Sequence, residues 1–329
     1  MNTVSCFKEK ISGKGLSVVF PEGSDERIIQ AARRLKDEAI ARPLLLGKSE
    51  QIEAAVEKAG VNLDSIETIN PGASDKLDAY VEKYIERRDD ISAAVAKRMV
   101  IKPLFYGGMM VASGDADAAV GGAASATSTL IQAATLTVGL MPGIKTVSSC
   151  FLMIIPDFLG QNDKAFIFAD CAVNIDPTAE QLADIAIASA ASARGILDTE
   201  PRVAMLSFST KGSASAPSVD KVKQAIEIVR ARKPELAIDG EFQADTAIVP
   251  SVAAKKVTEK SSVAGDANVI VFPNLDSGNI AYKLVQYMAN AQAIGPFLQG
   301  FAKPIGDLSR GASVDDIVST TVLTLAQLL

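Results

Sequence analysis

The sequence contains no histidine, the side chain that enzymes most often use to move protons near neutral pH. Its absence excludes Ser-His-Asp and Cys-His nucleophiles, and also every metal site that requires an imidazole ligand. Proton transfer must therefore fall to carboxylates, lysine, tyrosine or cysteine. Reactions that need charge neutralisation and a single carboxylate base remain open to this chain.

Cysteine is scarce as well. Cys6, Cys150 and Cys171 are scattered, odd in number and without Cys-x-x-Cys spacing. This pattern favours buried free thiols over a redox or metal-binding role.

Long apolar runs are also missing. The segment from Met1 to Leu16 mixes lysines with isolated apolar residues and lacks the apolar core of a signal peptide. The longest candidate, Cys150 to Pro156, is far too short to span a membrane. The net charge of −6 and the isoelectric point of about 5.0 give no general attraction to polyanions. We therefore expect a soluble, cytoplasmic protein with no nucleic-acid or membrane partner.

The chain has 329 residues, 48% of them hydrophobic, which is more than one core usually serves. Short apolar runs alternate with longer amphipathic ones, a pattern typical of βαβ units and a mainly parallel sheet. Turns at Pro142-Gly143 and Gly295-Pro296 predict the domain junctions. Residues 1–143 and 296–329 would form a first, discontinuous α/β domain, and residues 144–295 a second.

The apolar runs also predict individual elements. Strands are expected at residues 16–20, 43–46, 118–120, 146–155, 165–170, 202–208, 236–240 and 269–272. Helices are expected at residues 27–36, 76–88, 92–99, 179–193, 220–232 and 314–328, with another beginning near residue 130. Ser24 or Asp25 is the expected N-cap of the first of these helices.

Three polar segments follow predicted strands, and each has two interpretations. Gly121 to Thr129 offers backbone N–H groups and hydroxyls to an anion, but a turn and a helix N-cap explain it equally well. Ser207 to Ser213 combines hydroxyls, a lysine and a glycine, which suit phosphate, but solvated loops share that composition and are favoured. The three carboxylates of Asp239 to Asp245 fit either a metal or a helix N-terminus, and the second is favoured.

The fourth segment, Asp307 to Asp316, carries more chemistry. Ser313 and Asp316 have the spacing of a capping box, in which Asp316 stabilises only a helix start. The alternative is functional, because Arg310 offers a fork of donors for phosphate oxygens, Ser309 a hydroxyl and Asp316 a base. From the residues alone the two interpretations are equal, and one residue can serve both.

Together with other segments of the chain, these motifs resemble the phosphate acetyltransferase (phosphotransacetylase) family. The resemblance rests on Arg202 to Ser213, Asp239 to Asp245, Gly265 to Phe272, Gly278 to Tyr282 and Asp307 to Gly311, in the family's order. It implies two α/β domains with a cleft between them, similar to isocitrate dehydrogenases, and a homodimer. It also implies reversible acyl transfer between acetyl-CoA and phosphate, giving acetyl phosphate and CoA, by direct attack in a ternary complex. No cofactor, metal or covalent enzyme intermediate is expected.

The resemblance assigns roles to residues of this chain. Asp316 would be the base for the coenzyme A thiol, Ser309 would bind the thiol or the acyl carbonyl, and Arg310 would hold the phosphate. Residues that would bind substrate are Thr127, Ser128, Gln132 and Arg87.

Three positions depart from the family pattern. Ser125 stands where the family usually has histidine, Gln132 where it commonly has arginine, and Asp89-Asp90 replaces a basic stretch. Two of these changes remove positive charge from the expected phosphate side. Gln132 and Asp89-Asp90 keep open the alternative of a coenzyme A-binding relative with weakened catalysis. A transferase for propionyl, butyryl or branched acyl groups is a further alternative, because pocket size decides the acyl group and a sequence does not show it.

Overall fold

A computed structural model describes residues 3–88, 91–197 and 199–329 of the chain. It divides into two compact units: unit 1 comprises Met1–Met141 and Phe301–Leu329, and unit 2 comprises Pro142–Gly300. The sequence departure at Asp89-Asp90 lies outside the described residues.

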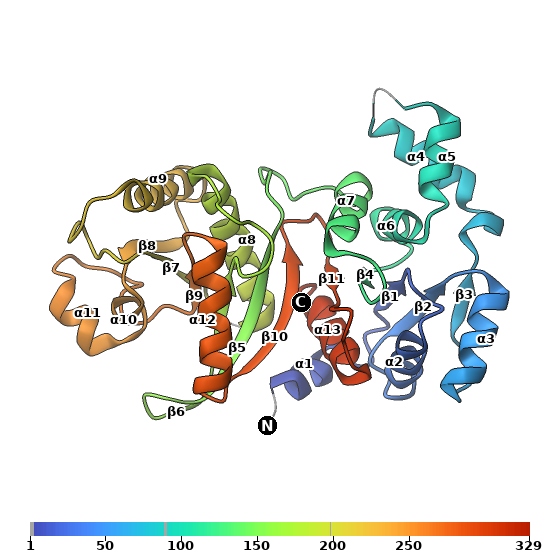
Figure 1. Cartoon of the computed structure of the whole chain (residues 1–329), viewed down its shortest axis with the longest axis horizontal. Coiled ribbons are helices and arrows are strands. Elements are labelled where there is room, and N and C mark those ends of the chain that lie inside the picture. The colour runs from blue at the N-terminus through green and yellow to red at the C-terminus, as the bar shows by residue number, and fades with distance from the viewer. Residues whose placement is uncertain (1–2, 89–90, 198) are drawn as a thin grey trace. The chain divides into compact units, whose positions relative to one another are not determined.

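The sheet of unit 1 is parallel, with strand order β3-β2-β1-β4-β11 (Figure 1). Its strands are β1 (Ser17–Phe20), β2 (Arg42–Leu46), β3 (Glu67–Ile69), β4 (Ala118–Gly121) and β11 (Ile305–Asp307). The central strands are buried along their length, as expected for a sheet covered on both faces. Val18 pairs with Pro43 on one side and with Ala118 on the other. Gly121 at the end of β4 pairs with Asp307 at the end of β11.

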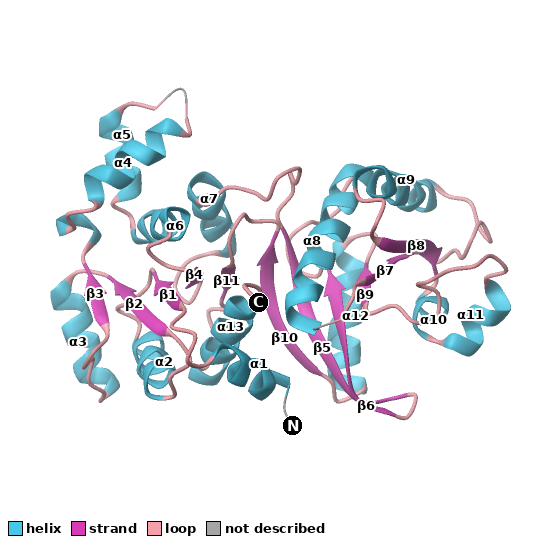
Figure 2. Ribbon diagram, turned by 180° about the vertical axis from the view of Figure 1, so that it is seen from behind, coloured by secondary structure: helices cyan, strands magenta, loops and turns pink. Residues whose placement is uncertain are grey.

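Helices cover both faces of this sheet, with α6 and α7 on one side and α2 and α13 on the other (Figures 1 and 2). The helices of unit 1 are α1 (Thr3–Ile11), α2 (Glu26–Asp37), α3 (Ser49–Ala59), α4 (Leu77–Glu86), α5 (Ala93–Val100), α6 (Pro103–Ser113), α7 (Thr127–Thr137) and α13 (Val314–Ala326), with a 3-10 turn at Pro71–Ala73.

Helix α2 illustrates how the sequence sets these boundaries. Asp25 caps it by accepting a hydrogen bond from the backbone N–H of Arg27, as expected for an aspartate N-cap. Ile28, Ile29 and Leu35 are buried on the face toward the sheet.

The sheet of unit 2 has the order β10-β5-β6-β9-β7-β8. Its strands are β5 (Ser148–Phe158), β6 (Gln161–Ala169), β7 (Arg202–Leu206), β8 (Ala237–Phe242), β9 (Val269–Val271) and β10 (Gln292–Gln299). β5 pairs antiparallel with both β10 and β6, while β6, β9, β7 and β8 are parallel. The mainly parallel α/β architecture predicted from the sequence is therefore confirmed, with one antiparallel portion.

The helices of unit 2 are α8 (Ala179–Leu197), α9 (Pro217–Arg232), α10 (Ala244–Ile248), α11 (Pro250–Lys256) and α12 (Leu275–Met288). Cys150 and Cys171 are free and fully buried, and burial raises the pKa of the Cys150 thiol to about 12. These two thiols are inert core residues, as predicted, whereas the side chain of Cys6 lies outside those described.

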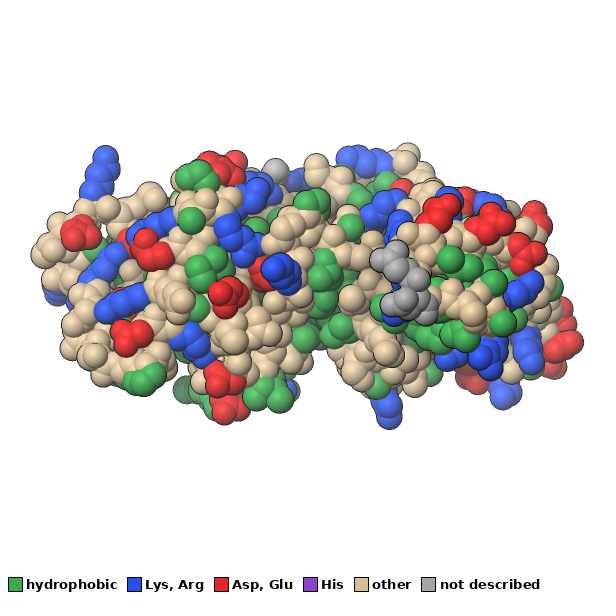
Figure 3. Space-filling model, turned by 90° about the horizontal axis from the view of Figure 1, so that it is seen from above, with side chains coloured by type: hydrophobic (Ala, Val, Ile, Leu, Met, Phe, Trp, Pro, Cys, Tyr) green, Lys and Arg blue, Asp and Glu red, His purple; other side chains and the backbone are tan. Residues whose placement is uncertain are grey.

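The described surface is mixed in charge. On the face in Figure 3, basic and acidic side chains alternate over short distances. Within the described part of the chain, no helix is long and apolar enough to cross a bilayer.

Candidate functional site

The site predicted from Asp307 to Asp316 begins at the carboxyl edge of the unit 1 sheet. Because β4 and β11 are parallel neighbours that end together at Gly121 and Asp307, the loops that follow them leave the same edge. Ligands of open α/β sheets gather at this edge. The first loop leads into α7 and the second into α13.

Arg27, near the start of α2, ties the two loops together. Its guanidinium donates to the carbonyl oxygens of Arg310 and Ala312 at 2.7 and 3.0 Å, and to that of Ala123 at 3.2 Å. It also forms an ion pair with Asp25 at 2.8 Å. The backbone beneath Ser309 and Arg310 is therefore held by a charged clamp, although both residues lie in an irregular loop.

The side chains on this clamped backbone are free. Ser309 and Arg310 are both exposed. Neither the Ser309 hydroxyl nor the Arg310 guanidinium forms a hydrogen bond or an ion pair with any residue in the described ranges. A guanidinium without a partner keeps all five donors for an anionic ligand.

Asp316 forms the capping box that its spacing predicts. Its Oδ2 accepts hydrogen bonds from the backbone N–H of Ser313 at 2.9 Å and from the Ser313 hydroxyl at 2.8 Å. All the hydrogen bonds that its carboxylate accepts from described residues go to Oδ2, and the side chain is exposed. The structural interpretation is thus realised, and Oδ1 remains available for chemistry.

Thr127 is the first residue of α7, three positions earlier than the predicted helix start. Its hydroxyl donates to Oδ2 of Asp307 at 2.6 Å. Asp307 is only 4% exposed, and its Oδ1 has no hydrogen-bond partner among the described residues. Burial raises the pKa of Asp307 to about 6; the Thr127 hydrogen bond opposes this rise and the negative charge of Glu22 adds to it.

Sequence reasoning missed Asp307 as a functional candidate, although it is the first residue of the motif that carries Ser309 and Arg310. An aspartate at the end of an apolar strand is a detectable signal, because charged residues are rarely buried without a partner.

Glu22 is a second residue that the sequence did not identify. Its carboxylate accepts hydrogen bonds from the backbone N–H groups of Ala123, Ala124 and Ser125 at 2.7 to 3.1 Å. Of the two interpretations of Gly121 to Thr129, the turn is therefore favoured for these three N–H groups, because an internal carboxylate already satisfies them. The polar groups left to a ligand here are the side chains of α7 and the first backbone N–H groups of that helix, which have no side-chain cap.

Two predicted substrate-binding residues share one face of α7. Ser128 and Gln132 are spaced i,i+4 and both are exposed. Arg87, the C-cap of α4, donates from its guanidinium to the carbonyl of Thr137 at the opposite end of α7. Thr137 lies ten positions after Thr127 along the helix, a distance of about 15 Å. Arg87 therefore lies apart from Ser309, Arg310 and Asp316, at a distance that only an extended ligand bridges.

In the two polar segments of unit 2, the side chains already pair with other residues of the protein. Lys211 forms an ion pair with Asp239 at 2.6 Å, and Ser209 donates to Glu241 at 2.7 Å. Asp245 pairs with Lys256 at 2.8 Å. The structure thus gives no support to a phosphate site on Ser207 to Ser213. Across the described ranges, no cluster of three or more acidic or cysteine residues has the arrangement of a metal site.

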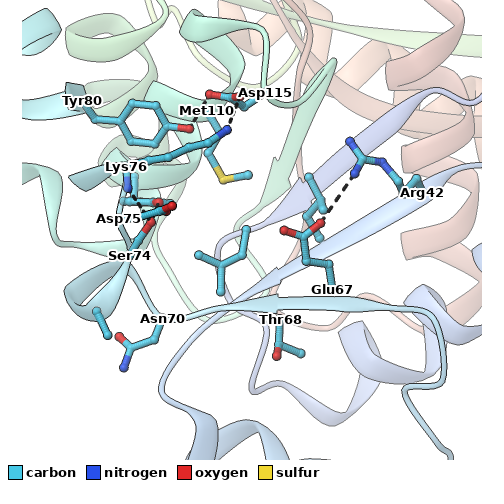
Figure 4. A pocket seen from close by; sticks show the side chains of 14 residues that line it. Arg42, Glu67, Thr68, Asn70, Ser74, Asp75, Lys76, Tyr80, Met110 and Asp115 are labelled. Carbon is cyan, nitrogen blue, oxygen red and sulfur yellow. Dashed lines mark hydrogen bonds and ion pairs between the residues drawn. The ribbon is translucent and has the colours of Figure 1, made fainter. Parts of the chain in front are cut away.

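A cavity of about 470 Å³ lies elsewhere in unit 1, against β2 and β3 (Figure 4). Its charged groups pair with one another: Lys76 and Tyr80 contact Asp115 at 2.5 and 2.6 Å, and Arg42 lies 3.5 Å from Glu67. This cavity holds none of the predicted site residues.

Comparison with known proteins agrees with the resemblance. Residues 3–325 match the family model described as phosphate acetyl/butaryl transferase. The phosphate acetyltransferase of Thermoanaerobacterium thermosaccharolyticum is 45% identical over 329 residues, covering 99% of each chain. That of Bacillus subtilis is 40% identical over 326 residues, covering 99% of this chain and 98% of the relative.

Solved structures give the same result. A phosphotransacetylase from Streptococcus pyogenes has 44% identity and a TM-score of 0.91, covering 99% of this chain and 97% of its own. A phosphotransacetylase from Staphylococcus aureus has 39% identity and a TM-score of 0.91, covering 100% and 98%. The predicted fold class, family and transferase activity are confirmed at the level of the family. With a family match and such relatives along its whole length, this chain belongs to the phosphate acetyl/butaryl transferases.

Proposed function

We propose that this protein is a phosphate acetyltransferase, which moves an acetyl group between coenzyme A and inorganic phosphate. The observation that carries the proposal is the loop after β11. Among the described residues, the Ser309 hydroxyl and the Arg310 guanidinium in this loop have no partner, and a capping box that keeps a carboxylate at Asp316 begins three residues later. The relatives named phosphate acetyltransferase support the choice of acyl group and acceptor.

The reaction follows from these groups. A phosphate oxygen attacks the thioester carbonyl carbon, a C–O bond forms, and the negative charge moves to the carbonyl oxygen. When the tetrahedral intermediate collapses, the C–S bond breaks and the thiolate leaves with its electron pair. The thiolate takes up the proton that phosphate releases, giving acetyl phosphate and coenzyme A. Phosphate is already anionic at neutral pH, so no activated serine or cysteine is needed.

Each of the three side chains has a role in this reaction. Arg310 binds phosphate oxygens and offsets the charge of the intermediate, because a guanidinium matches their geometry. Ser309 donates to the carbonyl oxygen or to the thiol sulfur. In the reverse direction Asp316 accepts the thiol proton, so that the thiolate attacks acetyl phosphate. No metal or cofactor takes part in the proposed chemistry.

The ends of α7 suit a long substrate. Thr127 and Ser128 lie at its N-terminus, Gln132 on its exposed face, and Arg87 at its C-terminal end. We assign the two ends of this helix to coenzyme A, whose extended arm and nucleotide match a spacing of about 15 Å, and Gln132 between them to phosphate.

The test is release of coenzyme A thiol from acetyl-CoA, with and without phosphate, before and after treatment with EDTA. We expect phosphate-dependent release that EDTA leaves unchanged. Loss with EDTA and recovery with a divalent ion would refute the metal-free mechanism. Faster release from propionyl-CoA or butyryl-CoA would reassign the acyl group, and binding of coenzyme A without release would identify a non-catalytic relative.

We also propose a cytoplasmic homodimer. Ile280, Leu284, Tyr287 and Met288 form one apolar face of α12 and are between 51% and 81% exposed. Covering such a face with a second copy removes apolar area from water. Light scattering of the wild type and of Tyr287→Glu gives the subunit number, and cell fractionation gives the compartment. A monomeric wild type would contradict the dimer.

A further inference from the structure

Asp307 combines features that folding alone does not explain. It ends β11, directly before the loop that carries Ser309 and Arg310, and it is 96% buried by side-chain neighbours and backbone. Oδ2 accepts from the Thr127 hydroxyl, while Oδ1 has no partner among the described residues. A buried carboxylate with one unsatisfied oxygen lowers stability, and an apolar or amide side chain would lower it less.

The surrounding backbone is shaped around this carboxylate. Gly122, in the loop after β4, has φ +103°, a conformation that side chains other than glycine rarely adopt. A Cβ atom at this position would lie 2.5 Å from Oδ1 of Asp307 and 2.7 Å from the carbonyl oxygen of Leu308. Glycine therefore lets the loop approach the carboxylate closely enough for Thr127 to reach Oδ2.

The direction of the hydrogen bond from Thr127 determines which ligand groups its hydroxyl can still bind. A threonine hydroxyl has one proton and two lone pairs, whereas an ionised carboxylate only accepts. The Thr127 proton is therefore committed to Asp307, at 2.6 Å. The half-buried Thr127 oxygen has only acceptor capacity left for a substrate. Acetyl phosphate, a dianion at neutral pH, offers only acceptor oxygens and does not match it, whereas an amide N–H or a thiol S–H does. Inorganic phosphate keeps a P–OH donor, so the KM for phosphate tests directly whether phosphate uses this oxygen.

We propose that Asp307 is a positioning residue, which fixes the Thr127 hydroxyl as an acceptor for a hydrogen-bond donor of coenzyme A. The donor is an amide N–H of the pantetheine arm or the thiol itself, and phosphate binding does not use this pair. The assignment rests on the proposed function for the identity of the two substrates.

Titration of Asp307 supports this geometry. Its pKa is raised to about 6, and once protonated the carboxyl can donate to Thr127, so the hydroxyl is no longer fixed as an acceptor. The charged group whose field reaches Asp307 is Glu22. Neither β4 nor α7 contains an ionisable side chain. The acidic residues of α13, Asp315 and Asp316, are engaged with Arg34 and Ser313, and Arg27 is paired with Asp25.

The experiment is a double-mutant cycle of Asp307→Leu and Thr127→Val, read as KM values in both reaction directions. Each single variant should raise the KM for coenzyme A about five- to ten-fold, and the double variant should be no worse than either single one. The KM values for phosphate and acetyl phosphate should change less than about two-fold. If the KM for acetyl-CoA rises as much as that for coenzyme A, the donor is an amide. If only the KM for coenzyme A rises, the donor is the thiol.

A second, more conservative variant tests the proposal if Asp307→Leu does not fold. Asp307→Asn keeps an acceptor without a charge and should raise the KM for coenzyme A only about two- to three-fold. In the wild type this KM should rise as the pH falls from 7.5 to 5.5, and in Asp307→Asn that component should vanish. Since the phosphates of the substrates also titrate, the comparison is between the two proteins at each pH.

Asp117→Asn is the matched control. Asp117 lies just before β4, at the opposite edge of the same sheet, and accepts hydrogen bonds from the backbone N–H and the hydroxyl of Ser17. It should lower Tm and leave the KM for coenzyme A unchanged. Additive effects in the cycle, an equal rise in the KM for phosphate, or the same KM change in Asp117→Asn would overturn the proposal. A wild type without phosphate-dependent release would instead refute the proposed function, and the cycle would then be read from calorimetric Kd values for coenzyme A.

Discussion

Two loops of this protein have nearly the same composition but differ in whether their polar side chains are exposed and have partners. Unit 1 presents Ser309-Arg310-Gly311 after β11, and unit 2 presents Thr210-Lys211-Gly212 after β7. Both offer a hydroxyl, a cation and a glycine. In unit 1 the hydroxyl and the guanidinium are exposed and have no described partner. In unit 2 Thr210 is buried, with 6% of its surface exposed, and Lys211 forms an ion pair with Asp239.

The difference comes from the neighbouring strand. β8 places Asp239 beside Ala204 of β7, within reach of Lys211. β4, the neighbour of β11, contains only Ala, Val and Gly, so it offers no carboxylate to Arg310. The comparison teaches that composition alone does not identify an anion site. What distinguishes the loop that we propose as the site is that its donors have no partner among the described residues while its backbone is held.

The largest expected effect tests whether the unit 1 loop is catalytic. Asp316→Asn should lower kcat about 10²–10⁴-fold if Asp316 is the base. If the capping box is its only role, kcat should stay normal and stability should fall by about 0.5–2 kcal/mol. Both quantities are measured on the same preparation, as kcat and the free energy of unfolding.

Asp315→Asn is the control for this prediction. Asp315 is the adjacent carboxylate, is exposed and pairs with Arg34. Its loss should leave kcat within about two-fold, the change that a weak surface pair allows. An equal loss of activity in both variants would remove the special role of Asp316.

The second prediction compares the buried aspartates of the two units by their stability at different pH values. The pKa of Asp307 is raised from 3.8 to about 6, so the folded state favours its neutral form. Its contribution to stability is complete below pH 4 and is lost as the pH rises through 6, a change of about 3 kcal/mol. Asp307→Asn should therefore stabilise the protein at pH 8 relative to the wild type, with the difference shrinking toward pH 4.

Asp239 should behave with the opposite sign. Burial alone would raise its pKa, but hydrogen bonds from Lys211 and from the backbone N–H of Gly240 outweigh burial, and the net pKa is lowered. Its stabilising contribution is present above pH 4 and is lost as the pH falls. Asp239→Asn should thus destabilise the protein at pH 7 and matter less at low pH. Denaturant unfolding across pH 4 to 8 measures both, and curves of the same sign would show that the two carboxylates are not in opposite environments.

The third prediction concerns the two cations. Arg310→Gln should raise the KM for phosphate or lower kcat by about 10- to 150-fold, since hydrogen bonds to charged groups contribute about 1.5–3 kcal/mol. Lys211→Gln should leave both kinetic constants unchanged and lower Tm, because Asp239 loses its closest partner. Steady-state kinetics and thermal unfolding of the two variants separate the roles. A kinetic defect in Lys211→Gln with a normal Tm would put part of the site in unit 2.

The sequence predicted local features of this fold well where one segment determines them. Asp25 as N-cap of α2 and the capping box of Ser313 and Asp316 were both predictable, because each depends on residues within three positions. β10 was missed, since Gly295 and Pro296 lie inside it at a register shift and were interpreted as a turn.

Contacts between distant segments were beyond the sequence. Glu22 contacts the loop about 100 residues later, and Asp307 meets Thr127 across 180 residues. Arg27 binds the backbone carbonyl of Arg310, 283 residues away. None of these contacts leaves a local pattern, because each depends on which strands become neighbours. The motif Asp307 to Gly311 pointed to the proposed site, but only the fold showed which of its side chains lack a partner among the described residues.

The smallest expected effect concerns Gln132, where the family commonly has arginine. Gln132 is exposed, so an arginine there would not be buried, and the variant Gln132→Arg should fold normally. A charge-assisted hydrogen bond exceeds a neutral one by very roughly 1 kcal/mol, which corresponds to about a five-fold change in affinity. We therefore expect Gln132→Arg to lower the KM for phosphate about five-fold and to leave the KM for acetyl-CoA nearly unchanged.

Gln51→Arg, the same substitution on the exposed face of α3, controls for the added charge and should change neither constant. Raising the ionic strength should weaken a purely long-range effect, whereas a direct contact persists. A folded Gln132→Arg protein with an unchanged or higher KM for phosphate would show that this position does not face the phosphate.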